Sequence, residues 1–407
     1  MPTAQALLLL LALRLGALSG AALPPLPALR LDASTVTISG ISSGADLAAH
    51  AAVALSDAIA GAAIFAGEPW LCAVVRFPGE PTYPCAQRAG GSPGPGCGAG
   101  AGYPSAAPCQ GCGGGAPNAT LSYDHCKKDA ASNPPVLVAP PVLVGLARAA
   151  AAAGRIPPTA HLARTRVLGF RGDRDAVYLA GSVNKTTEFF AAFASDAGAQ
   201  VRLVTGWPMQ HALPTVDPAV SPATCGVSSA GPPAMANCGY DGAGEALRHM
   251  YGPSVALTPP ASPACDAACV DRLVSFDQTR YFAADWAGRE LSSLGWLYVP
   301  SACSVSGGSG GGGGAPCKLH ISLHGCGMSV WSAAMGANYT RHSGFNVWGE
   351  ANNIVRLGPR EEGASYCQRD AQHSPFSHSP CLLCRSFCTL RAAASWRGAR
   401  PLRRLGS

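Results

Sequence analysis

Residues 35–67 read TVTISGISSGADLAAHAAVALSDAIAGAAIFAG, and this stretch decides the fold. Thr35 to Ser39 alternates β-branched and polar residues, which predicts a short strand. The Ala-rich segment from Ala45 to Asp57 predicts a helix, and the apolar run from Ile59 to Ala66 predicts a buried parallel strand. A strand, a glycine-bounded turn, a helix and a second strand in this order are typical of an α/β protein.

The same alternation returns further along the chain. The helix expected from Val177 to Ala194 lies between two expected strands, Arg166–Phe170 and Val201–Thr205. Further segments predict a helix and three strands, at Pro141–Ala153, Gly295–Pro300, Lys318–Leu323 and Asn353–Leu357. We therefore expect a mostly parallel sheet with helices on both faces.

Composition narrows the possible partners. The chain has 407 residues, 48% of them hydrophobic and 13% charged, with a net charge of +6. Beyond residue 358 there are eight Arg and three acidic residues, so this tail holds five of the six net charges. The remaining body is almost neutral, which argues against nucleic acid as a partner. It also has no apolar stretch long enough to span a membrane, so we expect no membrane partner.

The N-terminus predicts export. Residues 1–21 contain the apolar run Ala6 to Leu13, which is followed by small residues. This run has the length of the apolar core of a signal peptide and is too short to cross a bilayer. A buried strand or an artefact of the gene model are the alternatives, because Arg14 interrupts the run and no Lys or Arg precedes it. Seventeen Cys favour an oxidising compartment. Three glycosylation sequons begin at Asn118, Asn184 and Asn338, so we expect a secreted glycoprotein.

Several segments do not fit a regular core. Residues 72–126 are dense in Cys, Gly and Pro and predict a long insertion held by disulfides. Residues 225–269 predict a second Cys-rich loop region, and residues 306–316 a Gly-rich linker. Residues 359–407 have no periodicity and predict an aberrant or disordered tail. The C-x-x-C pairs at residues 109–112 and 381–384 could bind a metal, but disulfides are favoured in an exported chain.

Ser42 is the candidate nucleophile. It is the central residue of Gly40-Ile-Ser-Ser-Gly44, a Gly-x-Ser-x-Gly turn that exposes a serine hydroxyl and points the next N–H toward the reacting group. The same pattern occurs around Ser92 and Ser309, in the insertion and in the glycine linker. Only Ser42 follows an expected strand and precedes an expected helix, so its context selects it.

A serine nucleophile needs a base and an acid that orients the base. Asp173 and Asp175 follow the strand that ends at Phe170, and His211 follows the strand that ends at Thr205. A parallel sheet brings such positions to one edge, but these residues alone do not decide between the two Asp. A third segment, His324-Gly-Cys-Gly327, is similar to the oxyanion loop of many esterases, which there precedes the nucleophile. Here it follows His211, so the order of elements would be circularly permuted; a simple tight turn is the alternative.

About a dozen ordered motifs resemble the extracellular poly(3-hydroxybutyrate) depolymerases, a circularly permuted α/β-hydrolase family. The similarity covers about residues 33–357 and includes Gly40–Gly44, Ile64-Phe-Ala-Gly67, Gly172-Asp-Arg-Asp-Ala-Val177, His211-Ala-Leu-Pro-Thr215, Asn237-Cys-Gly-Tyr-Asp-Gly-Ala-Gly244, Gly295-Trp-Leu-Tyr-Val-Pro300, Leu323-His-Gly-Cys326 and Asn352-Asn-Ile354. The resemblance implies one α/β-hydrolase catalytic domain over residues 33–358. It implies a triad of Ser42, Asp175 and His211, and an oxyanion hole from the N–H groups of Ser43 and Cys326.

The function expected from this resemblance is hydrolysis of short-chain polyhydroxyalkanoate esters through an acyl-enzyme, by a monomer without cofactor or metal. Two alternatives stay open: a carboxylesterase on small or sugar-linked esters, and an inactive polymer- or glycan-binding or truncated product. They are motivated by the tail, which lacks the family's Gly-Cys-Trp segment and its aromatic residues. Without the four tail Cys, 13 of the 17 remain, so we expect one unpaired Cys, with Cys326 as the candidate.

Overall fold

The computed structural model describes residues 23–72, 126, 138–223, 225–228, 234–281, 292–304, 316–328 and 337–358. The predicted signal peptide, the interior of the 72–126 insertion, almost all of the glycine linker and the tail lie outside these residues. So do both C-x-x-C pairs and the sequon at Asn118.

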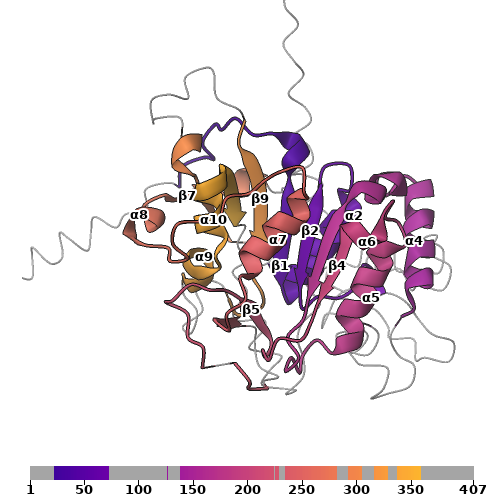
Figure 1. The fold of residues 1–407 in the computed structure, drawn as a ribbon. Coiled ribbons are helices and arrows are strands. Elements are labelled where there is room, and N and C mark those ends of the chain that lie inside the picture. Colours follow the sequence, from indigo (N-terminus) through magenta and orange to yellow (C-terminus); the bar gives the residue numbers. More distant parts are fainter. Residues whose placement is uncertain are drawn as a thin grey trace, which may run out of the picture.

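An eight-stranded sheet forms the centre of the molecule (Figure 1). Its strand order is β4-β3-β2-β1-β9-β10-β8-β7, and β8 alone runs antiparallel to its neighbours. The strand bounds are β1 Thr37–Ile41, β2 Gly61–Phe65, β3 Arg166–Phe170, β4 Val201–Val204, β7 Leu273–Asp277, β8 Leu294–Tyr298, β9 Lys318–Leu323 and β10 Ile354–Gly358. A second, two-stranded sheet pairs β5 (Ala212–Pro214) with β6 (Ala234–Ala236). The expected mostly parallel sheet is confirmed.

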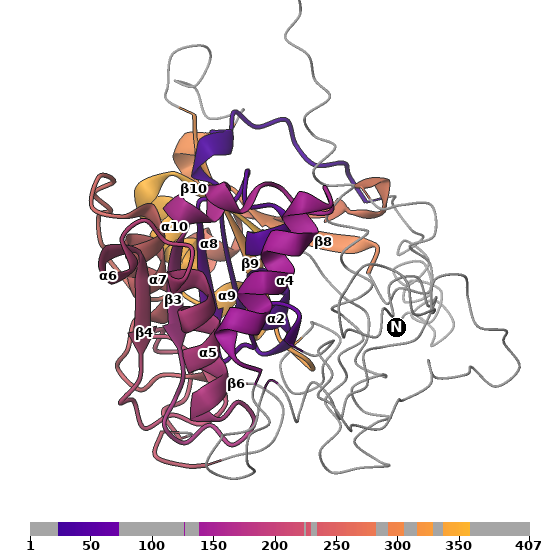
Figure 2. The same ribbon diagram turned by 90° about the vertical axis from the view of Figure 1, so that its right-hand side faces the viewer.

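Helices cover both faces of this sheet, because successive side chains of a strand point to opposite sides. In β2, Ala62 and Ile64 belong to one buried cluster, whereas Ala63 and Phe65 belong to the other. The first cluster includes residues of α2 (Ser43–Ala54), α4 (Pro140–Ala152) and α5 (Ala180–Ala191), and α4 lies in the foreground of Figure 2. The second cluster includes residues of α7 (Gly242–Tyr251), α9 (Asn338–His342) and α10 (Phe345–Asn352). Two one-turn helices, α6 (Ala197–Gln200) and α8 (Ala267–Val270), complete the described α-helices.

The order of the strands is circularly permuted, as expected. Strand β1, which leads to Ser42, lies between β2 and β9, and β9 leads to His324. In other α/β-hydrolases the strand before the oxyanion loop precedes the nucleophile strand in sequence. Here β9 follows β1 in the chain but pairs with it in parallel, with Thr37 opposite His320.

The structure corrects two predictions. The region 225–269 is not only a loop, because it contains α7, whose Ala246, Leu247 and Met250 pack on the sheet. Asp241 caps this helix by accepting from the Gly244 N–H. Cys326 is also not unpaired: it is disulfide-bonded, and its partner lies outside the described residues.

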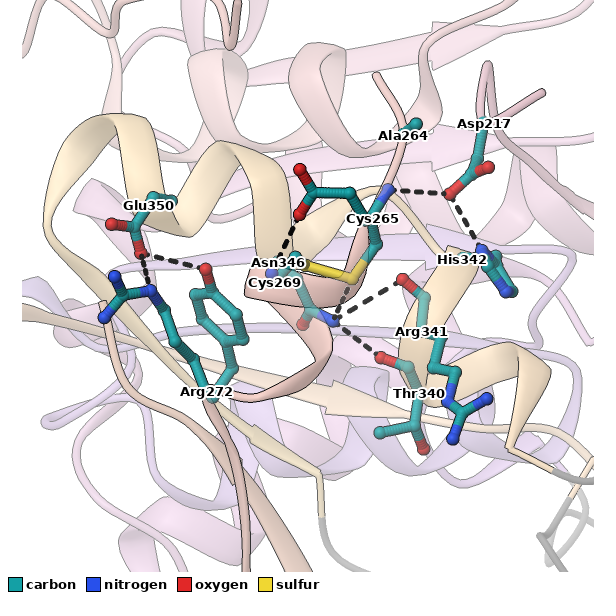
Figure 3. The surroundings of a disulfide bond; sticks show 12 residues. Asp217, Ala264, Cys265, Cys269, Arg272, Thr340, Arg341, His342, Asn346 and Glu350 are labelled. Carbon is teal, nitrogen blue, oxygen red and sulfur yellow. Dashed lines mark hydrogen bonds and ion pairs between the residues drawn. A yellow bond between two sulfur atoms is a disulfide. The ribbon is translucent and has the colours of Figure 1, made fainter. Parts of the chain in front are cut away.

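Four disulfides join described residues: Cys72–Cys126, Cys225–Cys238, Cys265–Cys269 and Cys303–Cys317. The first connects the two ends of the predicted insertion. The third lies among contacts that join α10 to the rest of the molecule (Figure 3). There Asn346 donates to the main-chain oxygen of Thr340 at 2.8 Å, and Arg272 pairs with Glu350 at 3.6 Å.

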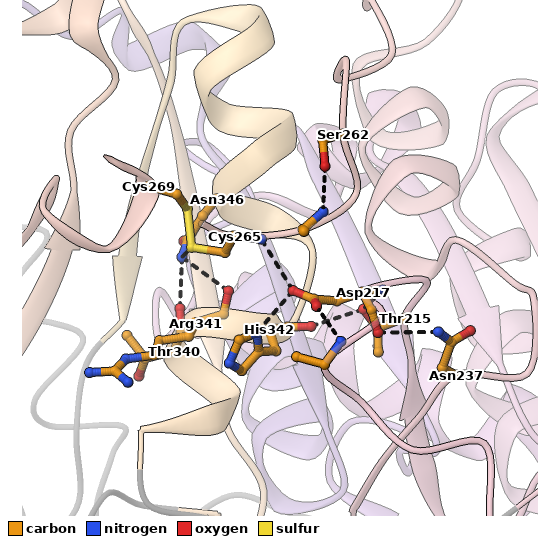
Figure 4. Close-up of polar contacts among 12 residues, drawn as sticks. Thr215, Asp217, Asn237, Ser262, Cys265, Cys269, Thr340, Arg341, His342 and Asn346 are labelled. Atoms are coloured by element: carbon orange, nitrogen blue, oxygen red, sulfur yellow. Dashed lines mark hydrogen bonds and ion pairs between the residues drawn. A yellow bond between two sulfur atoms is a disulfide. The ribbon is translucent and has the colours of Figure 1, made fainter. Parts of the chain in front are cut away.

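The carboxylate of Asp217 connects three segments that are distant in sequence (Figure 4). It accepts the N–H of Ala219 at 2.9 Å and that of Cys265 at 3.3 Å, and its Oδ2 lies 2.9 Å from His342 Nδ1. The Asp217 side chain is buried. These contacts hold the chain that follows His211 against α9, which follows the His324 segment.

Candidate active site

Ser42 occupies a sharp turn between β1 and α2. Its φ and ψ are 58° and −128°, a backbone conformation that non-glycine residues rarely adopt and that a surrounding structure must enforce. Gly40 and Gly44 make the turn possible: a Cβ on Gly40 would lie 2.1 Å from the Gly44 oxygen. The helix begins at Ser43, so the Ser43 N–H is one of the helix N–H groups without an intrahelical acceptor. The turn thus presents a hydroxyl and an available donor together.

The segment His324–Gly327 lies directly against this turn. A Cβ on Gly44 would lie 2.4 Å from the His324 oxygen and 2.7 Å from the Leu323 oxygen, so only glycine allows the approach. Cys326 follows in a tight turn in which Met328 N–H donates to the Gly325 oxygen at 3.1 Å. The structure therefore brings the segment that contains Cys326 to the segment that contains Ser42 and Ser43.

Asp175 and His211 form a buried pair. The Asp175 Oδ2 lies 2.9 Å from His211 Nδ1, and the two residues are 3% and 1% exposed. The other carboxylate oxygen accepts the N–H groups of Val177 at 2.8 Å and Tyr178 at 2.9 Å. Asp175 is thus oriented by three hydrogen bonds, and it fixes the imidazole with Nε2 directed away from it. Asp173 is exposed and instead accepts the N–H of Gly206.

Backbone contacts hold the acid turn against the loop that carries the histidine. Asp173 N–H donates to the Trp207 oxygen at 2.8 Å, and Arg174 N–H donates to the Met209 oxygen at 2.9 Å. Gly172 permits this approach, because a Cβ there would lie 2.2 Å from the Met209 oxygen. Since β1, β3 and β4 are parallel, Ser42, Asp175 and His211 all follow the carboxyl ends of strands at one edge of the sheet.

Two further side chains, Tyr178 and Asp46, belong to this site, and the sequence interpretation missed both. The Tyr178 ring stacks on the His211 imidazole with centroids 5.3 Å apart, and its hydroxyl donates to Asp46 Oδ2 at 2.5 Å. Through these two contacts Tyr178 connects the histidine to α2, the helix that follows Ser42. Burial and the carboxylates of Asp46 and Glu68 raise the pKa of Tyr178 well above its ordinary value. Asp46 comes four residues after Ser42, one helical turn away, which is the only signal the sequence offered.

Tyr339, in α9, contacts the end of β9, which leads into the His324–Gly327 segment. Its hydroxyl donates to the Leu323 oxygen at 2.7 Å and lies 2.9 Å from the Ser322 hydroxyl. The buried Arg356 guanidinium lies 5.4 Å from the centre of the Tyr339 ring. Tyr339 is the middle residue of the sequon at Asn338, and its contact with Leu323 was not predicted.

One group of side chains among the described residues has the spacing of metal ligands, namely Glu68, Cys72 and Cys126. Both sulfurs are in the Cys72–Cys126 disulfide, so they are not available as thiolates. The other serines in Gly-x-Ser-x-Gly patterns, Ser92 and Ser309, lie outside the described residues.

No family model matches the chain. A poly(3-hydroxybutyrate) depolymerase of Delftia acidovorans is 28% identical over 344 residues, which cover 84% of this chain and 54% of the relative. A polyhydroxybutyrate depolymerase of Talaromyces funiculosus is 26% identical over 336 residues, 82% of this chain and 77% of the relative. This chain therefore spans about half the length of the Delftia protein.

The fold is also similar to solved structures. A PHB depolymerase from Penicillium funiculosum superposes with a TM-score of 0.57 at 23% identity, covering 83% of this chain and 82% of the other. A serine-to-alanine variant of a PHB depolymerase in complex with an R3HB trimer gives the same TM-score, identity and coverage.

Proposed function

Because the chain belongs to the poly(3-hydroxybutyrate) depolymerase family, we propose that it is a serine esterase that cleaves ester bonds of short-chain polyhydroxyalkanoates. The observation that carries the proposal is the buried Asp175–His211 pair beside the strained turn of Ser42. Such an arrangement activates a serine hydroxyl, and it requires neither metal nor cofactor.

In this mechanism the Ser42 Oγ attacks the ester carbonyl while its proton passes to His211 Nε2. Asp175 keeps the histidine proton on Nδ1 and stabilises the imidazolium that forms. The N–H groups of Ser43 and Cys326 stabilise the oxyanion of the tetrahedral intermediate. The imidazolium then protonates the departing alcohol, leaving an acyl group on Ser42. Water hydrolyses this ester by the same steps, with His211 as the base.

The substrate class is inferred from the relatives. Both curated relatives are named as depolymerases of polyhydroxybutyrate, and one similar structure holds an R3HB trimer. A polyester of β-hydroxy acids presents neutral ester groups, which suits a buried triad in a nearly uncharged body.

Ser42→Ala tests the proposal. The variant is expected to lose hydrolysis of a soluble p-nitrophenyl butyrate and clearing of a polyhydroxybutyrate film, each by at least about 10³-fold. Thermal unfolding of the variant verifies that it is folded. The proposal is refuted if Ser42→Ala stays within a few-fold of wild type. A wild-type chain that neither cleaves these esters nor labels with a fluorophosphonate would instead be an inactive binding or truncated product.

A second candidate, a carboxylesterase on small esters, is favoured by one observation. The match covers 54% of the Delftia relative, so this similarity supports ester hydrolysis but does not by itself support attack on a polymer. The two functions differ in the ratio of film clearing to p-nitrophenyl butyrate hydrolysis. A polymer enzyme clears the film, whereas a small-ester enzyme cleaves p-nitrophenyl butyrate but leaves the film intact.

We also propose that the protein is secreted. Its four described disulfides, together with the bonded Cys326, support an oxidising compartment. None of the described helices is long and apolar enough to cross a membrane. To test this proposal, the protein is expressed with its native N-terminus, and the protein recovered from the culture medium is sequenced from its N-terminus. The proposal predicts a mature chain that begins near residue 22.

A further inference from the structure

The main-chain oxygen of Leu323 is a point where three segments of the chain meet. Leu323 is the last residue of β9 and directly precedes the His324–Gly327 segment. The hydroxyl of Tyr339, in α9, donates to this oxygen at 2.7 Å. Gly44, in the nucleophile turn, also approaches it, because a Cβ on Gly44 would lie 2.7 Å away. The position of this oxygen therefore affects how the His324–Gly327 segment meets the nucleophile turn.

A buried guanidinium lies beside this contact. Arg356, in β10, is 3% exposed, and no carboxylate pairs with it in the part of the chain that the structure describes. Its N–H groups donate instead to the Thr340 main-chain oxygen at 2.7 Å, the Asn346 side-chain oxygen at 3.2 Å and the Ser322 hydroxyl at 3.3 Å. Burial of a charge costs free energy unless hydrogen bonds compensate for it. These three oxygens supply that compensation, and one of them leads back to Leu323.

The number of protons fixes the direction of the hydrogen bonds. The hydroxyls of Ser322 and Tyr339 lie 2.9 Å apart. A guanidinium can only donate, so Ser322 accepts from Arg356, and a main-chain oxygen can only accept, so Tyr339 gives its single proton to Leu323. The Ser322 proton is then directed at the Tyr339 oxygen. Burial raises the pKa of Tyr339, so its hydroxyl keeps this proton at neutral pH. The result is one directed chain from Arg356 through two hydroxyls to the Leu323 oxygen.

We propose that Tyr339 is a positioning residue for the oxyanion hole, and that Arg356 and Ser322 fix the direction of its hydroxyl. This inference rests on the proposed function, in which the Cys326 N–H stabilises the oxyanion. Such a donor is effective only if it is already in place where the charge develops. Tyr339 would act through the Leu323 oxygen, three residues before Cys326, without touching the substrate.

Two variants interrupt the chain of hydrogen bonds at different points. Tyr339→Phe keeps the ring and removes the hydroxyl that holds the Leu323 oxygen. Ser322→Ala leaves that hydroxyl in place and removes only its link to Arg356. The first change releases the segment directly, whereas the second only weakens the polarisation of the Tyr339 hydroxyl. We therefore expect the same kind of effect from both, and a smaller one from Ser322→Ala.

The readouts are kcat and KM for p-nitrophenyl butyrate and the inhibition constant Ki of an alkyl trifluoromethyl ketone. When the ketone binds, the Ser42 Oγ–carbon bond forms, the π electrons of the carbonyl move to its oxygen, and the Ser42 proton passes to His211. The adduct places an oxyanion where the tetrahedral intermediate has one. Loss of a whole oxyanion-hole donor costs about 10²–10³ in kcat, and a displaced donor costs part of this.

Tyr339→Phe is expected to lower kcat/KM about tenfold, mainly through kcat, and to raise Ki by the same factor. Ser322→Ala is expected to change both quantities by about two- to threefold in the same directions. The parallel change of kcat/KM and Ki is the signature of the oxyanion hole, because the substrate in its ground state has no oxyanion. A purely structural role would lower the unfolding temperature and leave Ki unchanged.

Tyr251→Phe is the matched control. Tyr251 is also buried, and its hydroxyl lies 3.4 Å from that of Thr37, at the other end of β1 from Ser42. The substitution removes a buried hydroxyl in the same way, so stability is expected to fall, whereas kcat/KM and Ki are expected to equal those of wild type.

The inference is overturned if folded Tyr339→Phe, like Tyr251→Phe, has the Ki of wild type. If Tyr339→Phe does not fold, Ser322→Ala decides, and an unchanged Ki in that variant overturns the inference. A wild-type chain that hydrolyses no ester, or a Ser42→Ala variant that keeps its activity, would refute the proposed function and this inference with it.

Discussion

Replacement of Asp175 by asparagine is expected to remove nearly all ester hydrolysis and leave the fold intact. In the wild type, one carboxylate oxygen accepts two backbone N–H groups and the other faces His211 Nδ1. An asparagine must keep its oxygen toward the two N–H groups, because the opposite orientation would leave two buried donors unsatisfied at about 1–3 kcal/mol each. Its amide nitrogen therefore faces His211.

This orientation changes the tautomer of the histidine. An amide N–H directed at Nδ1 requires that nitrogen to be an acceptor, so the imidazole proton moves to Nε2. A protonated Nε2 cannot take the proton of Ser42. The same substitution in a Ser-His-Asp protease lowers kcat by about 10⁴, which corresponds to about 5.4 kcal/mol of transition-state stabilisation. We expect a loss of this order in kcat and little change in KM.

The assay is steady-state hydrolysis of p-nitrophenyl butyrate, with thermal unfolding of each variant as the test of folding. Asp173→Asn is the matched control, since it makes the same substitution two residues earlier on an exposed side chain that does not face His211. It is expected to keep kcat within about threefold of wild type. The assignment is wrong if folded Asp175→Asn retains a tenth of the activity, or if Asp173→Asn loses as much.

Three further predictions concern the surroundings of the site. Gly44→Ala places a Cβ against the Leu323–His324 backbone. The overpacking should lower the free energy of unfolding in urea by about 1–3 kcal/mol and lower kcat at least tenfold. An unchanged kcat would contradict the contact. Asp217→Ala leaves the donors of three segments without their acceptor and should cost about 3 kcal/mol in the same assay, whereas a loss below 1 kcal/mol would show that the contacts in Figure 4 contribute little. Burial lowers the pKa of His320 from 6.5 to about 3, so the unfolded chain binds a proton that the folded chain does not between these values. Stability should therefore fall by about 1.4 kcal/mol per pH unit for this group as the pH drops from 6.5 toward 3, and His320→Gln should reduce this slope by one proton.

The parts of the fold that the sequence predicted well are those specified by local pattern. The expected and observed bounds of β3 and β9 agree, because each strand ends directly before a segment of turn residues. β1 was expected at Thr35–Ser39 but spans Thr37–Ile41, since the extended chain continues into the Ser42 turn. The sequence predicts a turn around Ser42 from Gly40 and Gly44, but the contact of Gly44 with Leu323 joins residues that are distant in sequence.

The helices α7 and α10 were missed for a physical reason. Glycine disfavours an isolated helix by about 1 kcal/mol per residue, and α7 contains Gly242 and Gly244 while α10 contains Gly349. In the folded chain the absent side chain of Gly244 is what admits Trp348, because a Cβ there would lie 2.4 Å from the indole. Each helix is stable because the other packs on it, and no local window of the sequence contains both.

The same limit applies to the choice of the acid. Asp173 and Asp175 are alike as residues, and both follow β3, so the local sequence cannot decide between them. The folded structure distinguishes them. Gly172 lets the turn pack on Met209, and the resulting backbone geometry directs only Asp175 at His211. Tyr178 depends on that same turn: it donates its N–H to Asp175, its ring stacks on His211 and its hydroxyl donates to Asp46. Orientation of the acid and stacking of Tyr178 on the histidine are therefore two consequences of one backbone turn, and a variant that displaces the turn should disturb both together.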